Sequence, residues 1–184
     1  MSTEAYIYVA IRTPRGIGKA GKGSLYEVKP IDLVANLLEA LKERHNLDTS
    51  QVDDVILATG DPVNEQGSNI AKTAINYSSW DTVTTGAQIH RYCAGALDAV
   101  NVRAAKVMAG MEGLVCGGGV ESLSRVGMGA SGGAITDPWV QMKSLFISQG
   151  LGADLLANLD GFNREDVDRY ALMSQNRAAF ARDN

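Results

Sequence analysis

Cys93 is the first candidate for chemistry, because it lies where a strand pattern ends and a helix pattern begins. The run is Ile89-His90-Arg91-Tyr92-Cys93-Ala94-Gly95-Ala96-Leu97. A thiol at the start of a helix lies at the positive end of the helix dipole, which favours the nucleophilic thiolate. The small residues that follow allow close approach of backbone or substrate. A free cysteine is more often a small core residue, so the weight of this candidate depends on the rest of the chain.

The other reactive side chains favour structural roles. Cys116 lies in an apolar strand pattern, Leu114–Gly117, which predicts core packing. The two cysteines are 23 positions apart, a spacing that fits neither a disulfide framework nor a zinc site, so no metal is expected. His90, three residues before Cys93, is predicted to be structural. We expect Glu121 to anchor a loop or a dimer interface.

Two motifs near the N-terminus are weak. Residues 16–21 match G-x-G-x-x-G after a strand pattern, but the next helix pattern begins only at about Ile31. A dinucleotide site needs the helix to open within the motif. The overlapping phosphate-loop pattern has Gly23 where Ser or Thr must bind magnesium. A basic loop is the simpler interpretation. Arg12 is predicted to be a structural tether, and His45 a surface residue.

Composition excludes several classes of partner. The chain has a net charge of −4 and 45% hydrophobic residues, which is ordinary for a globular protein. It has no basic stripe for nucleic acid and no apolar run long enough to span a bilayer. The start, Met1-Ser2-Thr3-Glu4, lacks the pattern of a secretion signal. We therefore expect a cytoplasmic protein without nucleic-acid or membrane partners.

Strand and helix patterns alternate over the first two thirds of the chain, which predicts an α/β fold with parallel strands. The expected strands are 6–11, 52–59, 83–89 and 113–117, and the expected helices are 31–44, 68–77 and 94–109. Six apolar positions are expected on the inner side of the third helix: Ala94, Leu97, Val100, Ala104, Val107 and Met108.

The last third of the chain has a different residue pattern. Residues 125–150 show little periodicity and read as a long excursion or lid. A helix is predicted over 163–182, with Asn163 as its N-cap and acidic residues in its first turn. The chain stops directly after this helix, so we expect that a return to the sheet is interrupted.

Four segments together resemble the thiolase family, which includes acetyl-CoA acetyltransferase and 3-ketoacyl-CoA thiolase. They are Ala10–Pro14, Ile89–Leu97, Val115–Ser124 and Ser174–Ala178. The resemblance implies a thiolase-like βαβαβαβ half with a Gly-rich loop domain, and a complete fold of two such halves in αβαβα layers. Residues 1–120 would form an incomplete N-terminal α/β domain and residues 121–184 an incomplete loop domain, with the C-terminal thiolase domain absent.

The resemblance implies acyl transfer to coenzyme A through Cys93. Its thiolate would attack the keto carbonyl of a 3-ketoacyl-CoA, the C–C bond would break, and CoA would remove the acyl group from the resulting thioester. The reverse Claisen condensation would use the same acyl-cysteine. A thiol is both a soft nucleophile and a good leaving group. The Cys93 N–H would contribute to an oxyanion hole. CoA and acyl-CoA are then substrates, and no permanently bound cofactor is expected.

The sequence departs from the family in three ways. Thiolases carry a second half with a His that activates the nucleophile, an Asn-bearing motif and a second Cys, and none of these is present. Ser148-Gln149-Gly150 stands where short-chain enzymes have His-Met before Gly, which implies a substrate-binding segment for a broader range of acyl-CoA. Ala96 replaces the usual Gly after the nucleophile, and its methyl group would crowd the site.

The resemblance also implies partners. A homodimer or homotetramer is expected, with a complementary C-terminal half or a multienzyme partner of fatty-acid β-oxidation as further possibilities. A lone half would expose the apolar helix face from about Ala94 to Met108. Two alternatives stay open: a decarboxylating condensing enzyme of the ketoacyl synthase type, which also places Cys at a strand–helix junction, and a non-catalytic thiolase-like protein.

Overall fold

The computed structural model describes residues 4–184 and divides between Ser131 and Gly132 into two compact units. The first unit, up to Ser131, is an α/β layer structure that contains Cys93. The second, from Gly132 to Asn184, is helical. Assignment of residues 121–184 to a loop domain stays a prediction.

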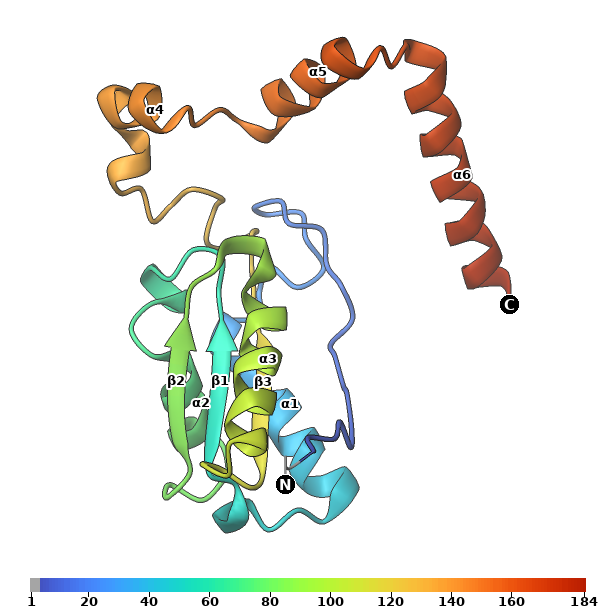
Figure 1. Cartoon of the computed structure of the whole chain (residues 1–184). Coiled ribbons are helices and arrows are strands. Elements are labelled where there is room, and N and C mark those ends of the chain that lie inside the picture. Colours follow the sequence, from blue (N-terminus) through green and yellow to red (C-terminus); the bar gives the residue numbers. More distant parts are fainter. Residues whose placement is uncertain (1–3) are drawn as a thin grey trace. The chain divides into compact units, whose positions relative to one another are not determined.

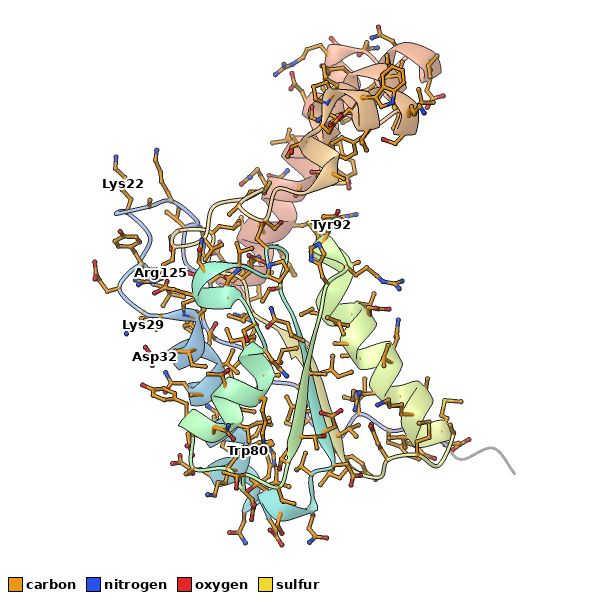
Figure 2. The ribbon with its side chains drawn as sticks, turned by 90° about the vertical axis from the view of Figure 1, so that its left-hand side faces the viewer. Lys22, Lys29, Asp32, Trp80, Tyr92 and Arg125 are labelled. Carbon is orange, nitrogen blue, oxygen red and sulfur yellow. The ribbon has the colours of Figure 1, made fainter. Side chains whose placement is uncertain are left out.

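A three-stranded parallel sheet forms the centre of the first unit. Its strands are β1 (Asp54–Ala58), β2 (Thr85–Ile89) and β3 (Val115–Gly119), in the order β2-β1-β3. Both pairings are parallel, as expected for an α/β fold. Helices α1 (Pro30–His45) and α2 (Ile70–Tyr77) cover one face, and α3 (Gly95–Met108) covers the other (Figures 1 and 2). All five residues of β1 are buried because this strand has neighbours on both edges and helices on both faces.

The core lies between the sheet and the pair α1 and α2. Helix α1 begins with Pro30 at its first turn and ends at Asn46, which adopts the left-handed conformation. Trp80 closes the end of this core that is lowest in Figure 2, and its indole N–H donates to the Leu38 carbonyl at 2.7 Å. The buried core cluster comprises Val34, Leu38, Val52, Val55, Leu57, Ile70, Ala71, Ala74, Ile75 and Trp80.

Helix α3 packs on the sheet through a different face from the one expected. Its buried residues are Gly95, Ala99 and Arg103, spaced four apart, whereas Leu97 and Met108 are 66% and 51% exposed. The packing is close: a Cβ on Gly117 of β3 would lie 3.0 Å from the Ala99 carbonyl. Small residues and one buried arginine therefore face the sheet, and much of the apolar face of α3 is open in this unit.

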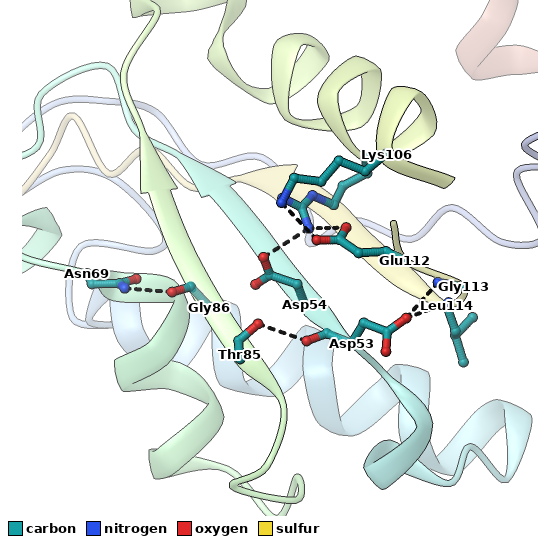
Figure 3. A network of polar contacts seen from close by, with 10 residues as sticks. Asp53, Asp54, Asn69, Thr85, Gly86, Lys106, Glu112, Gly113 and Leu114 are labelled. Atoms are coloured by element: carbon teal, nitrogen blue, oxygen red, sulfur yellow. Dashed lines mark hydrogen bonds and ion pairs between the residues drawn. The ribbon is translucent and has the colours of Figure 1, made fainter. Parts of the chain in front are cut away.

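Arg103 is buried in an ion-pair network at the N-terminal end of the sheet. Figure 3 shows Asp54, Glu112 and Lys106 of this network. Its Nη1 donates to Asp54 of β1 at 2.9 Å and to Glu112 at 2.5 Å, and Lys106 donates to Glu112 at 2.8 Å. The two cations and two carboxylates balance in charge. Because burying an unpaired charge is costly, this network fixes α3 against β1.

The predicted first strand, Tyr6–Ile11, does not form. The segment is part of no strand, and Tyr6, Ile7 and Tyr8 are 66%, 78% and 86% exposed. A β-rich pattern becomes a strand only when another strand satisfies its backbone, and within residues 4–184 no strand pairs with this one.

The second unit contains α4 (Pro138–Ser144), α5 (Gln149–Asp160) and α6 (Arg164–Asp183). The predicted N-cap is confirmed: Asn163 and Asp166 form a reciprocal capping box at the start of α6. The stretch 125–150, expected to lack regular structure, holds the short helix α4, which Asp137 caps. No residue of 132–184 is buried.

Candidate active site

Cys93 lies in a 3₁₀ turn, Tyr92–Ala94, that joins the end of β2 to the start of α3. Its side chain is exposed. Figure 2 shows Tyr92 in this turn, at the edge where the parallel strands end. In parallel α/β sheets, ligands bind in the crevice outside the carboxyl ends of the strands. The predicted location of the thiol, between a strand and a helix, is therefore confirmed.

The backbone around Cys93 leaves a donor free. Tyr92 adopts a left-handed conformation, with φ of 45°, which is uncommon for a residue other than glycine. Gly95 lets α3 begin directly against β1, since a Cβ there would lie 2.5 Å from the Ala58 Cβ. No side chain caps the start of α3, and within residues 4–184 the Cys93 N–H forms no backbone hydrogen bond. The Cys93 N–H is therefore available to an anion, whereas the Ala94 and Gly95 N–H groups donate to the Arg91 and Tyr92 carbonyls.

Three contacts hold the turn. The His90 Nδ1 lies 3.2 Å from the Thr59 carbonyl oxygen at the end of β1, and the His90 and Tyr92 rings meet edge-on with centroids 4.5 Å apart. Arg91 and Asp98 form an ion pair at 3.1 Å between the turn and the first part of α3. The turn is thus tied both to β1 and to the helix that it opens.

A network of side-chain amides joins the three strand ends. Gln88 of β2 donates to Thr59 Oγ1 at 2.9 Å and to the Gln66 carbonyl at 2.6 Å. The fully buried Gln66 side chain donates to Glu121 at 2.8 Å and accepts from the Ser122 N–H at 2.6 Å. Glu121 also accepts from the Gly60 N–H. The expected role of Glu121 as a loop anchor is confirmed.

Asp61 fixes a glycine-rich loop at the same edge of the sheet. Its buried carboxylate accepts from the Ser131 hydroxyl at 2.7 Å and from the N–H groups of Ser131 and Gly129 at 2.9 and 3.0 Å. The hydrogen bonds from Ser131, followed by that from Gly129 and the nearby His90, lower the pKa of Asp61 despite its burial. No pattern in the sequence indicated that the side chains of Asp61, Gln66 and Gln88 hold the loops at this edge of the sheet.

Cys116 contrasts with Cys93. It lies near the start of β3, packs against the core cluster and is only partly exposed. Burial raises the pKa of its thiol to about 11. The prediction that Cys116 is a packing residue is confirmed.

The structure also describes the other residues that the sequence analysis singled out. His45 is exposed at the end of α1, as expected. The expected tether at Arg12 is not seen among residues 4–184, where its side chain donates only to the adjacent Thr13 carbonyl. Residues 16–19 have no regular structure and residues 20 and 21 lie in a turn, so no helix opens within the glycine motif. The Ala96 methyl lies against Gly119 at the end of β3, where a Cβ would stand 3.1 Å away.

The segment Ser148-Gln149-Gly150 opens α5 in the second unit, with Ser148 as an N-cap that makes no side-chain hydrogen bond. Cys93 belongs to the first unit, so a shared substrate site stays a prediction. Across residues 4–184, no group of three or more His, Cys, Asp or Glu side chains is placed to hold a metal ion. Over the same range, no helix has the length and apolar character needed to cross a membrane.

Comparison with protein-family models identifies the family of this chain. Residues 5–184 match the thiolase N-terminal domain. The chain belongs to the thiolase family. It is 33% identical over 182 residues to a 3-ketoacyl-CoA thiolase of Bacillus subtilis (strain 168), covering 97% of this chain and 45% of that protein. It is 36% identical over 197 residues to a 3-oxoadipyl-CoA/3-oxo-5,6-dehydrosuberyl-CoA thiolase of Escherichia coli (strain K12), covering 97% of this chain and 48% of that protein.

A solved structure agrees with the family assignment. The crystal structure of the Bacillus anthracis acetyl-CoA acetyltransferase is similar with a TM-score of 0.60 and 30% identity, over 67% of this chain and 30% of that chain. The chain thus spans about half the length of the curated relatives it matches. The observed α/β unit with its parallel sheet is the thiolase N-terminal fold.

Proposed function

We propose that the complete protein is a thiolase that transfers acyl groups between 3-ketoacyl-CoA and CoA, with Cys93 as the nucleophile. The observation that carries this proposal is the exposed Cys93 thiol at the β2–α3 turn of a chain in the thiolase family. The similar thiolase of Bacillus subtilis is named for 3-ketoacyl-CoA, and that of Escherichia coli for 3-oxoadipyl-CoA and 3-oxo-5,6-dehydrosuberyl-CoA.

The proposed reaction has two steps. The Cys93 thiolate attacks the C3 carbonyl of the 3-ketoacyl-CoA, and the C2–C3 bond breaks with its electron pair on C2, which takes up a proton to give acetyl-CoA. The CoA thiolate then attacks the acyl-Cys93 thioester and releases the shortened acyl-CoA. The free N–H group of Cys93 supports stabilisation of the oxyanion in each step.

The base for this chemistry must come from outside these residues. Within residues 4–184, no side chain is hydrogen-bonded to the Cys93 thiol, and His90 is directed at the Thr59 carbonyl. We infer that a complementary C-terminal half supplies the activating His, as the resemblance implies. The exposed apolar side chains of α3, Leu97 and Met108, support a covering half of this kind, and a homodimer or homotetramer of the complete protein.

The test is acylation of the full protein. Intact mass is measured before and after incubation with acetyl-CoA, for the parent and for the Cys93→Ser and Cys116→Ser variants. One acetyl group on the parent and on Cys116→Ser, and none on Cys93→Ser, is the expected result. Transfer from an acyl carrier protein but not from acetyl-CoA would instead indicate a decarboxylating condensing enzyme. An adduct that persists in Cys93→Ser would refute the assignment.

A second candidate is a non-catalytic thiolase-like protein that binds CoA esters or a partner thiolase. The lack of a base at the Cys93 thiol within residues 4–184 favours it. Saturable binding of acetyl-CoA without an acyl-Cys93 adduct, measured by calorimetry and intact mass on the same sample, would support this reading over catalysis.

A further inference from the structure

We propose that His90 is a positioning residue for Cys93, acting through the hydrogen bond from its Nδ1–H to the Thr59 carbonyl. The inference rests on the proposed function of Cys93 as nucleophile. His90 itself touches neither the thiol nor the N–H groups beside it in any hydrogen bond of residues 4–184. It acts on the turn that carries them.

The direction of the hydrogen bond defines the tautomer. A carbonyl oxygen only accepts, so the His90 Nδ1, 3.2 Å from the Thr59 oxygen, must carry the proton. The bond joins the residue after β2 to the residue after β1, and these strands are paired in parallel. It therefore fixes the start of the nucleophile turn to the central strand of the sheet.

The next contact passes this constraint to the strained residue. The Tyr92 ring packs edge-on against the His90 ring at 4.5 Å, with an interplanar angle of 65°. Tyr92 is the residue with φ of 45°, a conformation that costs energy unless the surroundings hold it. Tyr92 is 61% exposed, so the His90 ring is the aromatic contact that supports it.

The left-handed Tyr92 sets the position of the thiol. It turns the chain from the direction of β2 into the 3₁₀ turn, so that Cys93 comes just before Gly95, the first residue of α3. At that position Cys93 lies next to Ala94, the N-cap of α3, and within residues 4–184 its own N–H makes no backbone hydrogen bond. Loss of the His90 bond frees Tyr92 to return to an ordinary conformation and moves Cys93 away from the positive end of the α3 dipole.

The experiment uses the thiol itself as the reporter. Alkylation of Cys93 by iodoacetamide is followed by mass spectrometry in the full chain for the parent, His90→Leu and His90→Asn. Leucine has no donor, whereas the asparagine amide N–H can replace the Nδ1–H. We expect Cys93 to react about two- to five-fold more slowly in His90→Leu, which is the size of a helix-dipole effect, and at the parent rate in His90→Asn.

The chain offers two internal controls. His45, the other histidine, is exposed on α1, and His45→Leu should leave the rate unchanged. Cys116 is partly buried in β3 and reports opening of the fold. If the Cys116 rate rises in His90→Leu, the variant has lost structure, and the comparison then rests on His90→Asn and on the spectrum of the parent.

The spectrum tests the hydrogen bond itself, whereas a slower Cys93 rate beside an unchanged Cys116 rate separates positioning from a merely structural role. The imidazole ¹⁵N shifts of the parent, recorded well above the usual histidine pKa of about 6.5, should show His90 protonated on Nδ1. An Nε2–H tautomer, an unchanged Cys93 rate in a folded His90→Leu, or no recovery in His90→Asn would each overturn the proposal. Alkylation needs no acyl-CoA, so failed acylation with a His90-dependent rate would refute only the proposed function.

Discussion

The two ends of the parallel sheet are built differently. At the N-terminal end, Arg103 of α3 is buried between Asp54 and Glu112 in charge-assisted hydrogen bonds. At the C-terminal end, amides and carboxylates such as Gln66 and Glu121 are directed at backbone N–H groups and at each other. The N-terminal end fixes α3 against β1. The C-terminal end leaves the Cys93 thiol exposed, next to loops that are joined by hydrogen bonds.

The difference separates stability from chemistry within one layer of structure. A buried ion pair gives α3 a defined position, and its charged groups are enclosed in the fold. The other end keeps its polar groups satisfied without covering Cys93, whose turn remains open. The same helix therefore has one end held by the core and one end that presents the nucleophile.

The largest effect is expected from Arg103→Met, which keeps the length of the side chain and removes its charge. Asp54 and Glu112 would lose their buried partner, and such a loss costs about 3–5 kcal/mol of unfolding free energy. Urea unfolding followed by circular dichroism measures it. Arg182→Met, which removes an exposed ion pair with Asp183, is the matched control and should change stability by less than about 0.5 kcal/mol. Equal losses in both variants would contradict the contrast between the two ends.

The two thiols should differ next most strongly. Burial raises the pKa of Cys116 from 9.0 to about 11, so at pH values below this range its thiolate is about a hundredfold scarcer than that of an ordinary thiol. Iodoacetamide should therefore label Cys93 first, and the Cys116 rate should rise about tenfold per pH unit until pH approaches 11. Peptide mass spectrometry of Cys93→Ser and Cys116→Ser follows each site alone. Comparable rates at neutral pH would show that β3 does not protect its thiol.

Glu121→Ala tests the bracing of the C-terminal end. The Gln66 amide, which is fully buried, and the Gly60 N–H would lose their acceptor, at a cost of about 1–3 kcal/mol. Thermal and urea unfolding measure the loss, with Glu43→Ala on the exposed side of α1 as the control. A loss no larger than that of the control would mean that water replaces the carboxylate without penalty.

The smallest effect is expected from Arg91→Ala. Arg91 forms an ion pair with Asp98 at 3.1 Å, but its side chain is 67% exposed, so the pair should contribute less than about 1 kcal/mol to stability. This variant allows the exposed arginine–aspartate pair at the C-terminal end of the sheet to be compared with the buried pair at the N-terminal end. Unfolding free energies of Arg91→Ala and Arg103→Met, measured under one set of conditions, should differ several-fold. A similar loss of unfolding free energy in both variants would contradict the difference between the exposed and the buried pair.

Much of the first unit was predictable from local patterns. Helical spacing located α1, α2 and α3 to within a few residues, β-rich runs located β1, β2 and β3, and Asn163 marked the start of α6. These signals are local, since caps and periodicity involve residues within a few positions of one another. The position of Cys93 between β2 and α3 followed for the same reason.

Other features depended on segments that are distant in the sequence. Periodicity shows that a helix has an apolar face but not that this face meets the sheet, and α3 instead buries Gly95, Ala99 and Arg103. The β-rich segment 6–11 lacks a pairing strand in the described part of the chain, and no local pattern reveals that. Asp61, Gln66 and Gln88 meet at one edge because two crossover connections make the three strands parallel, so that their carboxyl ends lie together.

Neighbouring residues were enough to predict the alternation of β1–β3 with α1–α3, the α/β class, the packing role of Cys116 and a thiol at a strand–helix junction. Packing between distant segments decided that Cys93 is exposed, that His90 is directed at Thr59, and that Arg103 is an interior residue. Burial and hydrogen bonding are properties of surfaces that form when distant segments pack together, so they are set by the fold as a whole.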